Sequence, residues 1–384
     1  MDKGELYYMR DLSEIRNEID SVDAEIVALY EKRMRLAEQV AEYKIGTGKK
    51  VLDKEREKSK LDKIKTYATT EFTKCGVTEL FEQIMAMSRK RQYQMLTEHG
   101  MIEKPGFDMV EKLPVAKAKI VFQGVEGAYT QVAMKRFFGE NIDSMHVETW
   151  RDAMETIKTG EADYAVLPLE NSSAGIISEN YDLLVEYGYS IVGEQIIKID
   201  HCLLGTQEAE LSDIKQVYSH PQALMQCSLF LEGHRTWENL ASKNTAMAAK
   251  QIKEDNDKSV AAIANRLTAD IYGLKILQEN IQNNSNNSTR FIIVSKEKIY
   301  VKDAGKISIY FELPNESGSL YHALSHFIYN NINMNRIESR PISGRNWEYR
   351  FFIDFDGNLE DSAVQNALRG LKEETAKMAI LGNY

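Results

Sequence analysis

The stretch IVALYEKRMRLAEQVAEYK (residues 26–44) places an arginine, Arg33, inside an apolar stripe. Hydrophobic residues recur every three or four positions over residues 12–43, which is typical of a helix that buries one face against other helices. The stripe consists of Leu12, Ile15, Ile19, Val22, Ile26, Leu29, Leu36, Val40 and Tyr43. A buried guanidinium loses hydration that hydrogen-bonded anions must replace. Alternatively, Arg33 reaches water from the edge of the stripe, as long cationic side chains often do.

A cationic pair and a polar pair are predicted to line one cavity. Lys44 follows Arg33 by 11 residues, about three helical turns, so the two cations share a face. In a later predicted helix (residues 78–96), Ser88 and Gln92 occupy positions of the apolar stripe. Between them, IGTGKK breaks the first helix, and Asp53 is a candidate N-cap for a second. A short helical hairpin has little core of its own, so a helical dimer is expected.

Composition limits the classes of protein that this chain can represent. With 384 residues, 43% hydrophobic content and a net charge of −10, a globular protein of two or three domains is expected, without nucleic-acid or membrane partners. No apolar run approaches a membrane span, and a cytoplasmic location is expected. The three cysteines form no CxxC pair and the histidines show no metal-binding spacing, so neither a metal nor another cofactor is expected.

The pattern of elements predicts a multi-domain chain. Residues 1–100 are predicted to be all-α, and residues 101–117 to be a polar linker. Residues 118–298 alternate short apolar strands with helices, which indicates an α/β domain with a mainly parallel sheet. Residues 305–384 follow the order βαββαβ, which predicts an α+β ferredoxin-like domain.

The helical segment closely resembles the all-helical chorismate mutase family. The residues that carry the resemblance are Arg16, Arg33, Lys44, Asp53, Arg56, Glu57, Ser88 and Gln92. It implies an intertwined dimer in which Arg16 completes the partner subunit's site, and it implies the pericyclic rearrangement of chorismate to prephenate. That reaction transfers no proton and needs no nucleophile, which suits a site without histidine or cysteine.

The chorismate mutase resemblance also implies a role for each residue. Arginines would clamp the carboxylates through charge-assisted bonds, each worth roughly 1.5–3 kcal/mol. Lys44 and Gln92 would donate to the ether oxygen, which gains negative charge as its C–O bond stretches. Glu57 would accept from the ring hydroxyl. The carboxylate clamps would be Arg16, Arg33 and Arg56, and the supporting residues Asp53 and Ser88.

Three polar loops follow or precede strands of the α/β segment, where ligands of open α/β sheets bind. They are QGVEGAYTQ (residues 123–131), PLENSSAG (residues 168–175) and NNSTRF (residues 286–291). Helix caps and ordinary loop chemistry would also explain their hydroxyl and amide side chains.

Together with SHPQALMQC (residues 219–227), NTAMAA (residues 244–249) and AAIANRLTADIYGL (residues 261–274), these loops resemble prephenate dehydratase. The resemblance implies a two-lobed fold like that of periplasmic binding proteins, with the active site in the cleft. Prephenate would lose CO₂ and water to give phenylpyruvate, with Thr289 as proton donor to the departing hydroxyl. The remaining substrate-binding residues would be Glu170, Asn171, Ser172, Thr245, Arg290 and Phe291.

Two positions of the dehydratase segment need comment. Family members commonly have Gly-Ser-Tyr/Phe-Ser where this chain has Gly-Ala-Tyr-Thr (residues 127–130), so Ala128 lacks a donor hydroxyl. His220, in SHPQ, is predicted to be structural.

The βαββαβ unit resembles the ACT domain, a dimeric amino-acid-binding module. ESRP (residues 338–341) matches its regulatory motif, whereas GSLY (residues 318–321) departs from the usual Gly-Ala-Leu-Val. The resemblance implies phenylalanine as an allosteric inhibitor. A role in dimerisation alone is the other interpretation. The implied effector-binding residues are Gly318, Ser319, Leu320, Glu338, Ser339, Arg340 and Pro341.

The three resemblances predict a bifunctional chorismate mutase and prephenate dehydratase with a regulatory domain, assembled as a homodimer or higher homo-oligomer. A binding protein with degenerate catalytic domains would show gaps at Arg33, Lys44 or Thr289, and none of these is missing. A preference for arogenate, the amino analogue of prephenate, is a closer alternative, because only one substituent differs.

Overall fold

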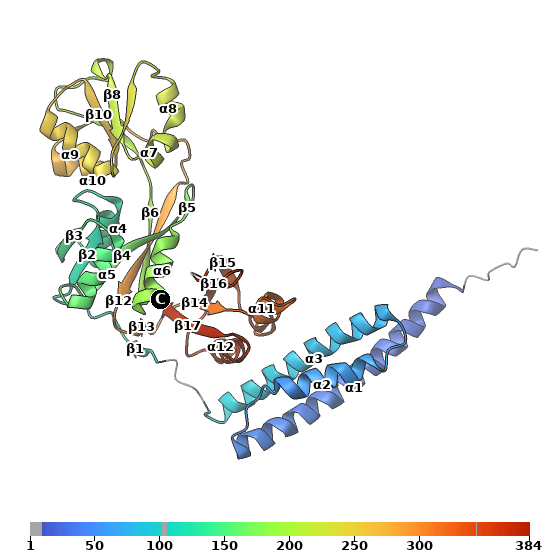
Figure 1. Cartoon of the computed structure of the whole chain (residues 1–384). Helices are drawn as coiled ribbons and strands as arrows, with labels where there is room; N and C mark the ends of the chain where they lie inside the picture. The colour runs from blue at the N-terminus through green and yellow to red at the C-terminus, as the bar shows by residue number, and fades with distance from the viewer. Residues whose placement is uncertain (1–9, 102–105, 343) are drawn as a thin grey trace, which may run out of the picture. The chain divides into compact units, whose positions relative to one another are not determined.

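The computed structural model describes residues 10–101, 106–342 and 344–384 (Figure 1). The described residues divide into two compact units. The first comprises those within 1–104, 311–351 and 359–378, and the second those within 105–310, 352–358 and 379–384. Three strands contribute residues to both units: β14 (Lys306–Glu312), β16 (Tyr349–Asp356) and β17 (Lys377–Asn383).

The first unit begins with three helices, as predicted: α1 (Leu12–Thr47), α2 (Lys54–Lys65) and α3 (Glu71–Glu98). Gly48, with φ 69°, ends α1 in the left-handed conformation that glycine adopts without steric strain. Asp53 caps α2 by accepting from the backbone N–H of Arg56 at 3.1 Å, which confirms the predicted N-cap. Helix α3 starts earlier than predicted because Thr70 and Thr73 form a reciprocal capping box.

The C-terminal residues follow the predicted order β-α-β-β-α-β through β14, α11 (Ser319–Tyr329), β15 (Met334–Pro341), β16, α12 (Ser362–Glu374) and β17. In the first unit, α11 packs on α12, and α12 packs on α3. Tyr93 of α3 is 2% exposed and Leu371 of α12 is fully buried. Burial of such large apolar side chains stabilises this packing.

The main sheet of the second unit has the strand order β16-β14-β17-β6-β12-β4-β2-β3. Alternate residues of β4 pack into different apolar clusters, Ala165 and Leu167 into one and Tyr164 and Val166 into the other, so both faces of the sheet are covered. The strands are β2 (Lys119–Gln123), β3 (Asp143–Val147), β4 (Tyr164–Asn171), β5 (Gly175–Ile176), which pairs with β4, β6 (Ser190–Lys198) and β12 (Ser288–Ser295). The helices are α4 (Tyr129–Phe138), α5 (Trp150–Thr159) and α6 (Ser178–Tyr187).

A second lobe of this unit is built on a five-stranded sheet of order β11-β7-β10-β8-β9. All five residues of β10 (Val260–Ala264) are buried, as expected for a strand with helices on both faces. The other strands are β7 (Cys202–Gly205), β8 (Gln216–Ser219), β9 (Glu238–Ala241) and β11 (Lys275–Gln278). The helices are the 3₁₀ turn Leu211–Asp213, α7 (Pro221–Gln226), α8 (Ser228–Glu232), α9 (Thr245–Asp255) and α10 (Arg266–Tyr272).

Two predictions about the second unit are wrong. The sheets are mixed rather than mainly parallel, because β12 runs antiparallel to β4 and β6, and β7 antiparallel to β10 and β11. An apolar run has the same composition in either direction, so the sequence pattern could not set strand direction. The predicted linker also contains a strand, β1 (Asp108–Val110), which pairs in parallel with β13 (Ile299–Val301).

Candidate active sites

Arg33 of α1 points at α3, where it meets the predicted polar pair. Its Nη1 donates to Ser88 Oγ at 2.5 Å and to the backbone oxygen of Ile84 at 3.3 Å. Ser88 is 6% exposed, so the guanidinium has a neutral and largely desolvated partner. A hydroxyl satisfies hydrogen bonds of the guanidinium without neutralising its charge.

Lys44 lies further along the same face of α1 and contacts the second polar residue. Its Nζ donates to Gln92 Oε1 at 3.1 Å and to the backbone oxygen of Val51 at 2.6 Å. Because Gln92 accepts through Oε1, its Nε2 remains to donate to another group. Each of the two cations therefore contacts one of the two polar side chains, and that all four line one cavity stays a prediction.

Positive charge in this site exceeds what its own acids neutralise. Burial lowers the pKa of Arg33 and of Lys44, and the negative charges of nearby acids only partly oppose it. The pKa of Lys60 is lowered first by burial and then by the positive charges of Arg33 and Arg56. Cations held close together at reduced hydration favour binding of a multiply charged anion.

Helix α2 supplies the other predicted residues of the helical site. Glu57 Oε2 accepts from Arg89 Nη1 at 2.5 Å, an arginine to which the sequence assigned no role. Arg56 is exposed, and so is Arg16 on α1. The exposure of Arg16 fits a residue that acts outside its own chain.

The apolar stripe of α1 is not covered within this chain. Leu29 is 65% exposed and Ile26 is 52% exposed. Both line an apolar groove of about 490 Å³ between α1 and α3, which Phe81, Ile84 and Arg33 also line. The face of α1 that packs on α3 instead buries Ala41. The described residues therefore do not provide the predicted burial of the stripe.

The second candidate site is a cavity of about 420 Å³ between the two lobes of the second unit. Both lobes contribute to its wall, and among the described residues no Asp, Glu, Lys or Arg side chain lines it. The N-termini of α4 and α9 reach it through Tyr129 and Thr245, and helix N-termini carry partial positive charge that favours anions. The predicted residues on its wall are Asn171, Thr245, Thr289 and Phe291.

Thr289 is held by an amide of defined orientation. Asn171 Nδ2 donates to Thr289 Oγ1 at 2.9 Å. Asn171 Oδ1 accepts from the backbone N–H groups of Ser173 at 3.0 Å and Ala174 at 2.8 Å, which determines which end of the amide faces Thr289. Because Thr289 already accepts a hydrogen bond, its own proton is available to donate into the cavity, and donation is strengthened by the bond it receives.

Arg290 does not lie on the cavity, contrary to the prediction that it binds substrate. It donates to Glu194 Oε2 at 2.7 Å, Asp354 Oδ2 at 2.6 Å and Tyr384 Oη at 2.6 Å. Successive side chains of a strand point to opposite faces, so Thr289 faces the cavity and Arg290 faces the other side of β12. Its guanidinium is therefore a structural partner for two carboxylates.

Glu170 and Ser172 are also absent from the cavity wall, contrary to prediction. Ser172 Oγ accepts from the backbone N–H of Ser288 at 3.0 Å. Glu170 precedes Asn171 in β4, so alternation turns its side chain to the other face of the strand, whereas Ser172 lies in the turn that follows β4.

Several cavity residues were not predicted. Tyr129 Oη donates to the backbone oxygen of Asp200 at 2.8 Å, and His201 Nε2 lies 3.0 Å from Gln226 Oε1. Burial lowers the pKa of His201, which favours the neutral ring. His220 caps α7 by accepting from Gln222 N–H at 3.2 Å, as its predicted structural role requires, but it also lines the cavity. No spacing motif marks these residues.

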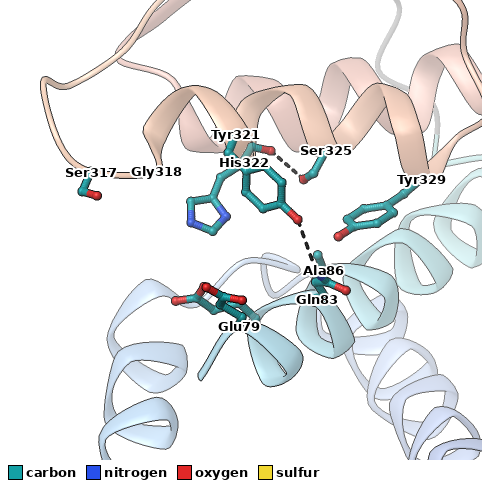
Figure 2. A pocket seen from close by; sticks show the side chains of 10 residues that line it. Glu79, Gln83, Ala86, Ser317, Gly318, Tyr321, His322, Ser325 and Tyr329 are labelled. Atoms are coloured by element: carbon teal, nitrogen blue, oxygen red, sulfur yellow. Dashed lines mark hydrogen bonds between the residues drawn. The ribbon is translucent and has the colours of Figure 1, made fainter. Parts of the chain in front are cut away.

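The predicted effector segment begins α11 beside a cavity of about 460 Å³ in the first unit. Figure 2 shows Gly318 and Tyr321 facing Glu79 and Gln83 of α3, with Tyr321 Oη accepting from Gln83 Nε2 at 3.2 Å. In β15 the residues at 338–341 alternate between half-buried and exposed. The four therefore do not share one face.

Two negative findings apply to the described ranges of the chain. No helix there is long and apolar enough to cross a membrane. No group of three or more His, Cys, Asp or Glu side chains there is placed to hold a metal ion.

Comparison with known proteins assigns the two segments that hold these sites to two enzyme families. The chorismate mutase type II family model matches residues 15–93, and the prephenate dehydratase model matches residues 120–299. The fold and sites thus define an enzyme that joins a helical mutase to an α/β dehydratase. A bifunctional chorismate mutase/prephenate dehydratase of Enterobacter agglomerans is 33% identical over 377 residues, which is 96% of this chain and 95% of the relative. The chain belongs to the family of bifunctional chorismate mutase/prephenate dehydratases.

Solved structures match over about two thirds of this chain. A prephenate dehydratase of Arthrobacter aurescens in complex with L-Phe is 33% identical, with a TM-score of 0.64, and the match covers 69% of this chain and 89% of that chain. GqqA, described as a novel type of quorum quenching acylase, is 30% identical, with a TM-score of 0.64, covering 69% of this chain and 96% of its own.

Substitution Arg290→Met should destabilise the second unit rather than impair substrate binding. Asp354 is 5% exposed and loses its arginine, and breaking a buried ion pair costs about 3–5 kcal/mol. Chemical denaturation should show this loss of unfolding free energy. The matched control is Arg266→Met, since Arg266 pairs with Glu279 at the surface and should change stability by less than about 1 kcal/mol. If the variant kept its free energy of unfolding but had a raised KM for prephenate, Arg290 would be a substrate-binding residue instead.

Proposed function

We propose that the helical site rearranges chorismate to prephenate and that the interlobe cavity converts prephenate to phenylpyruvate. The observation that carries the first assignment is the desolvated cluster in which Arg33 meets Ser88 and Lys44 meets Gln92. The second assignment rests on Thr289, whose hydroxyl is oriented by Asn171 in a cavity between two lobes.

In the mutase site, positioning and electrostatics supply the catalysis. Arg33, Arg56 and Arg16 of the partner subunit hold the substrate carboxylates, which keeps the reacting carbons close together. Lys44 and the Nε2 of Gln92 donate to the ether oxygen as it gains charge. Glu57 accepts from the ring hydroxyl, and its other oxygen is held by Arg89.

In the dehydratase site, breaking of the bond to the ring carboxylate releases CO₂ and supplies the electrons that complete the aromatic ring. As the ring double bonds shift, the hydroxyl leaves with the electron pair of its own C–O bond, and Thr289 donates its proton toward the departing oxygen. The helix N-termini at Tyr129 and Thr245 replace Arg290 as the groups that receive the carboxylates. The cavity wall holds no carboxylate that would pair with the ammonium group of arogenate, which favours prephenate as substrate.

The two activities should separate in single variants. Arg33→Ala removes charge-assisted bonds worth roughly 1.5–3 kcal/mol each, so formation of prephenate from chorismate should fall at least about tenfold while supplied prephenate is still converted. Thr289→Val should do the reverse, since valine keeps the shape and loses the hydroxyl. Prephenate and phenylpyruvate are followed separately, and parallel assays on arogenate compare the two substrates.

Thr289→Ser is the matched control for the dehydratase variant, because it retains a hydroxyl. Undisturbed dehydration in Thr289→Val would remove Thr289 from the mechanism. Full mutase activity in Arg33→Ala would overturn the assignment of the helical site.

The exposed apolar stripe of α1 is the surface on which two copies of the chain form a dimer. If each mutase site takes Arg33 from one subunit and Arg16 from the other, the inactive variants Arg16→Ala and Arg33→Ala should complement each other. Unfolding and refolding an equimolar mixture should restore about a quarter of the wild-type mutase activity, because half of the dimers then hold one intact site. Each variant refolded alone is the control, and no recovery in the mixture would mean that every site lies within one chain.

The C-terminal βαββαβ unit is an ACT domain that binds phenylalanine and inhibits the dehydratase. Its strand and helix order, and the complex of the Arthrobacter aurescens relative with L-Phe, support this assignment. Calorimetry should show L-phenylalanine binding, and millimolar L-phenylalanine should lower the rate of prephenate dehydration. D-phenylalanine is the control. Absence of binding heat, or a dehydratase rate that L-phenylalanine leaves unchanged, would restrict this unit to dimerisation.

A further inference from the structure

The last two residues of α12 are carboxylates that contact the mutase helices within the first unit. Glu373 and Glu374 lie outside the segment that the chorismate mutase family model matches, residues 15–93. Each nevertheless contacts a residue adjoining the mutase site. Their contacts form two routes, one to Glu57 and one to the turn before α2.

The first route runs from Glu374 through Arg89 to Glu57. Arg89 donates from Nη2 to Glu374 Oε1 at 3.0 Å and from Nη1 to Glu57 Oε2 at 2.5 Å. Its side chain is 12% exposed. Burial opposes the charge of Arg89, but the two carboxylates outweigh burial and raise its pKa. A guanidinium shared by two carboxylates fixes their relative positions, because its donors lie in one rigid plane.

The second route runs from Glu373 to the turn that holds Lys44. Glu373 Oε2 accepts from the backbone N–H of Leu52 at 3.2 Å and from the hydroxyl of buried Tyr93. Leu52 lies between Val51, whose carbonyl receives Lys44 Nζ, and Asp53, the N-cap of α2. Glu373 thus anchors the one turn that positions both Lys44 and the start of α2.

We propose that Glu373 and Glu374 are positioning residues of the mutase reaction. Glu374 holds Arg89 so that Glu57 Oε1 meets the ring hydroxyl of the substrate, and Glu373 holds the turn that sets Lys44 against the ether oxygen. The inference rests on the proposed mutase function of the helical site. It makes the C-terminal domain part of the mutase site, whether or not an effector is bound.

The test uses the full-length chain with Glu373→Gln, Glu374→Gln and the double variant. Glutamine keeps the shape and removes the charge, so mutase kcat/KM should fall about tenfold in the double variant, as expected when charge-assisted bonds are lost. The dehydratase rate on supplied prephenate should stay within about twofold, since its site lies in the second unit. Thermal unfolding checks that each variant is folded.

The matched control is Glu38→Gln. Glu38 also pairs with an arginine of α3, Arg91, at 2.7 Å, but Arg91 has no described contact with Glu57. This variant should leave mutase kcat/KM within about twofold. Equal losses in Glu38→Gln and Glu374→Gln would overturn the proposal, because they would report a general weakening of the helices.

A double-mutant cycle separates positioning from stability. In a Glu57→Gln background, the amide still accepts from the ring hydroxyl, so residual activity is measurable, and Glu374→Gln should then change kcat/KM by less than about twofold. A loss as large as in the wild-type background would overturn the route through Arg89. If Arg33→Ala lowers mutase activity while Glu373→Gln, Glu374→Gln and the double variant do not, the positioning role is wrong but the mutase assignment stands. If Arg33→Ala is itself fully active, the mutase assignment fails.

Discussion

The helical part of this enzyme depends on one half-buried cation, Arg33, whose hydrogen-bond partners are neutral. Arg33 lies between α1 and α3, and its side-chain partner there is a serine hydroxyl. Lys44 lies on the same face of α1, and its ammonium group donates to an amide oxygen and a backbone carbonyl. Such a site favours a bound anion, and in the proposed function the chorismate dianion supplies the negative charge. This accounts for the two polar residues in the apolar stripe of α3, Ser88 and Gln92, which contact the cations.

The dehydratase unit differs from the helical part in the role of its buried arginine and in the side chains that line its candidate site. Its buried arginine, Arg290, is neutralised by Glu194 and Asp354 and serves the structure. Among the described residues, no charged side chain lines the cavity that we propose for the dicarboxylate, and its wall offers helix N-termini, amides and the hydroxyl of Thr289. An arginine that is paired with carboxylates of its own chain thus has a structural role, whereas one without such a pair is available to an anionic ligand.

The C-terminal unit has contacts that its sequence motifs do not indicate. Through α12 it meets Arg89 and the turn before α2, and through Tyr321 it meets Gln83 of α3. Tyr321 stands where the ACT family usually has valine, so this departure from the motif has a physical use in this chain as a contact with the mutase helix. The segment that was expected to bind an amino acid or to serve dimerisation alone therefore also contacts residues that adjoin the proposed mutase site.

The amino-acid sequence alone determined the local features: the helical periods, the Asp53 cap, the shared face of Arg33 and Lys44, the shared face of Ser88 and Gln92, and the position of Thr289 at the start of a strand. These depend on residues within a few turns of one another or on a spacing that a helix preserves. Only the tertiary structure decided which face of β12 meets the cavity, the direction of β7 and β12, and the partners of Arg89 and Arg290. The physical reason is that periodicity states which side chains share a face, whereas the group opposite that face comes from a distant part of the chain. For the exposed stripe of α1, the described residues do not supply that group.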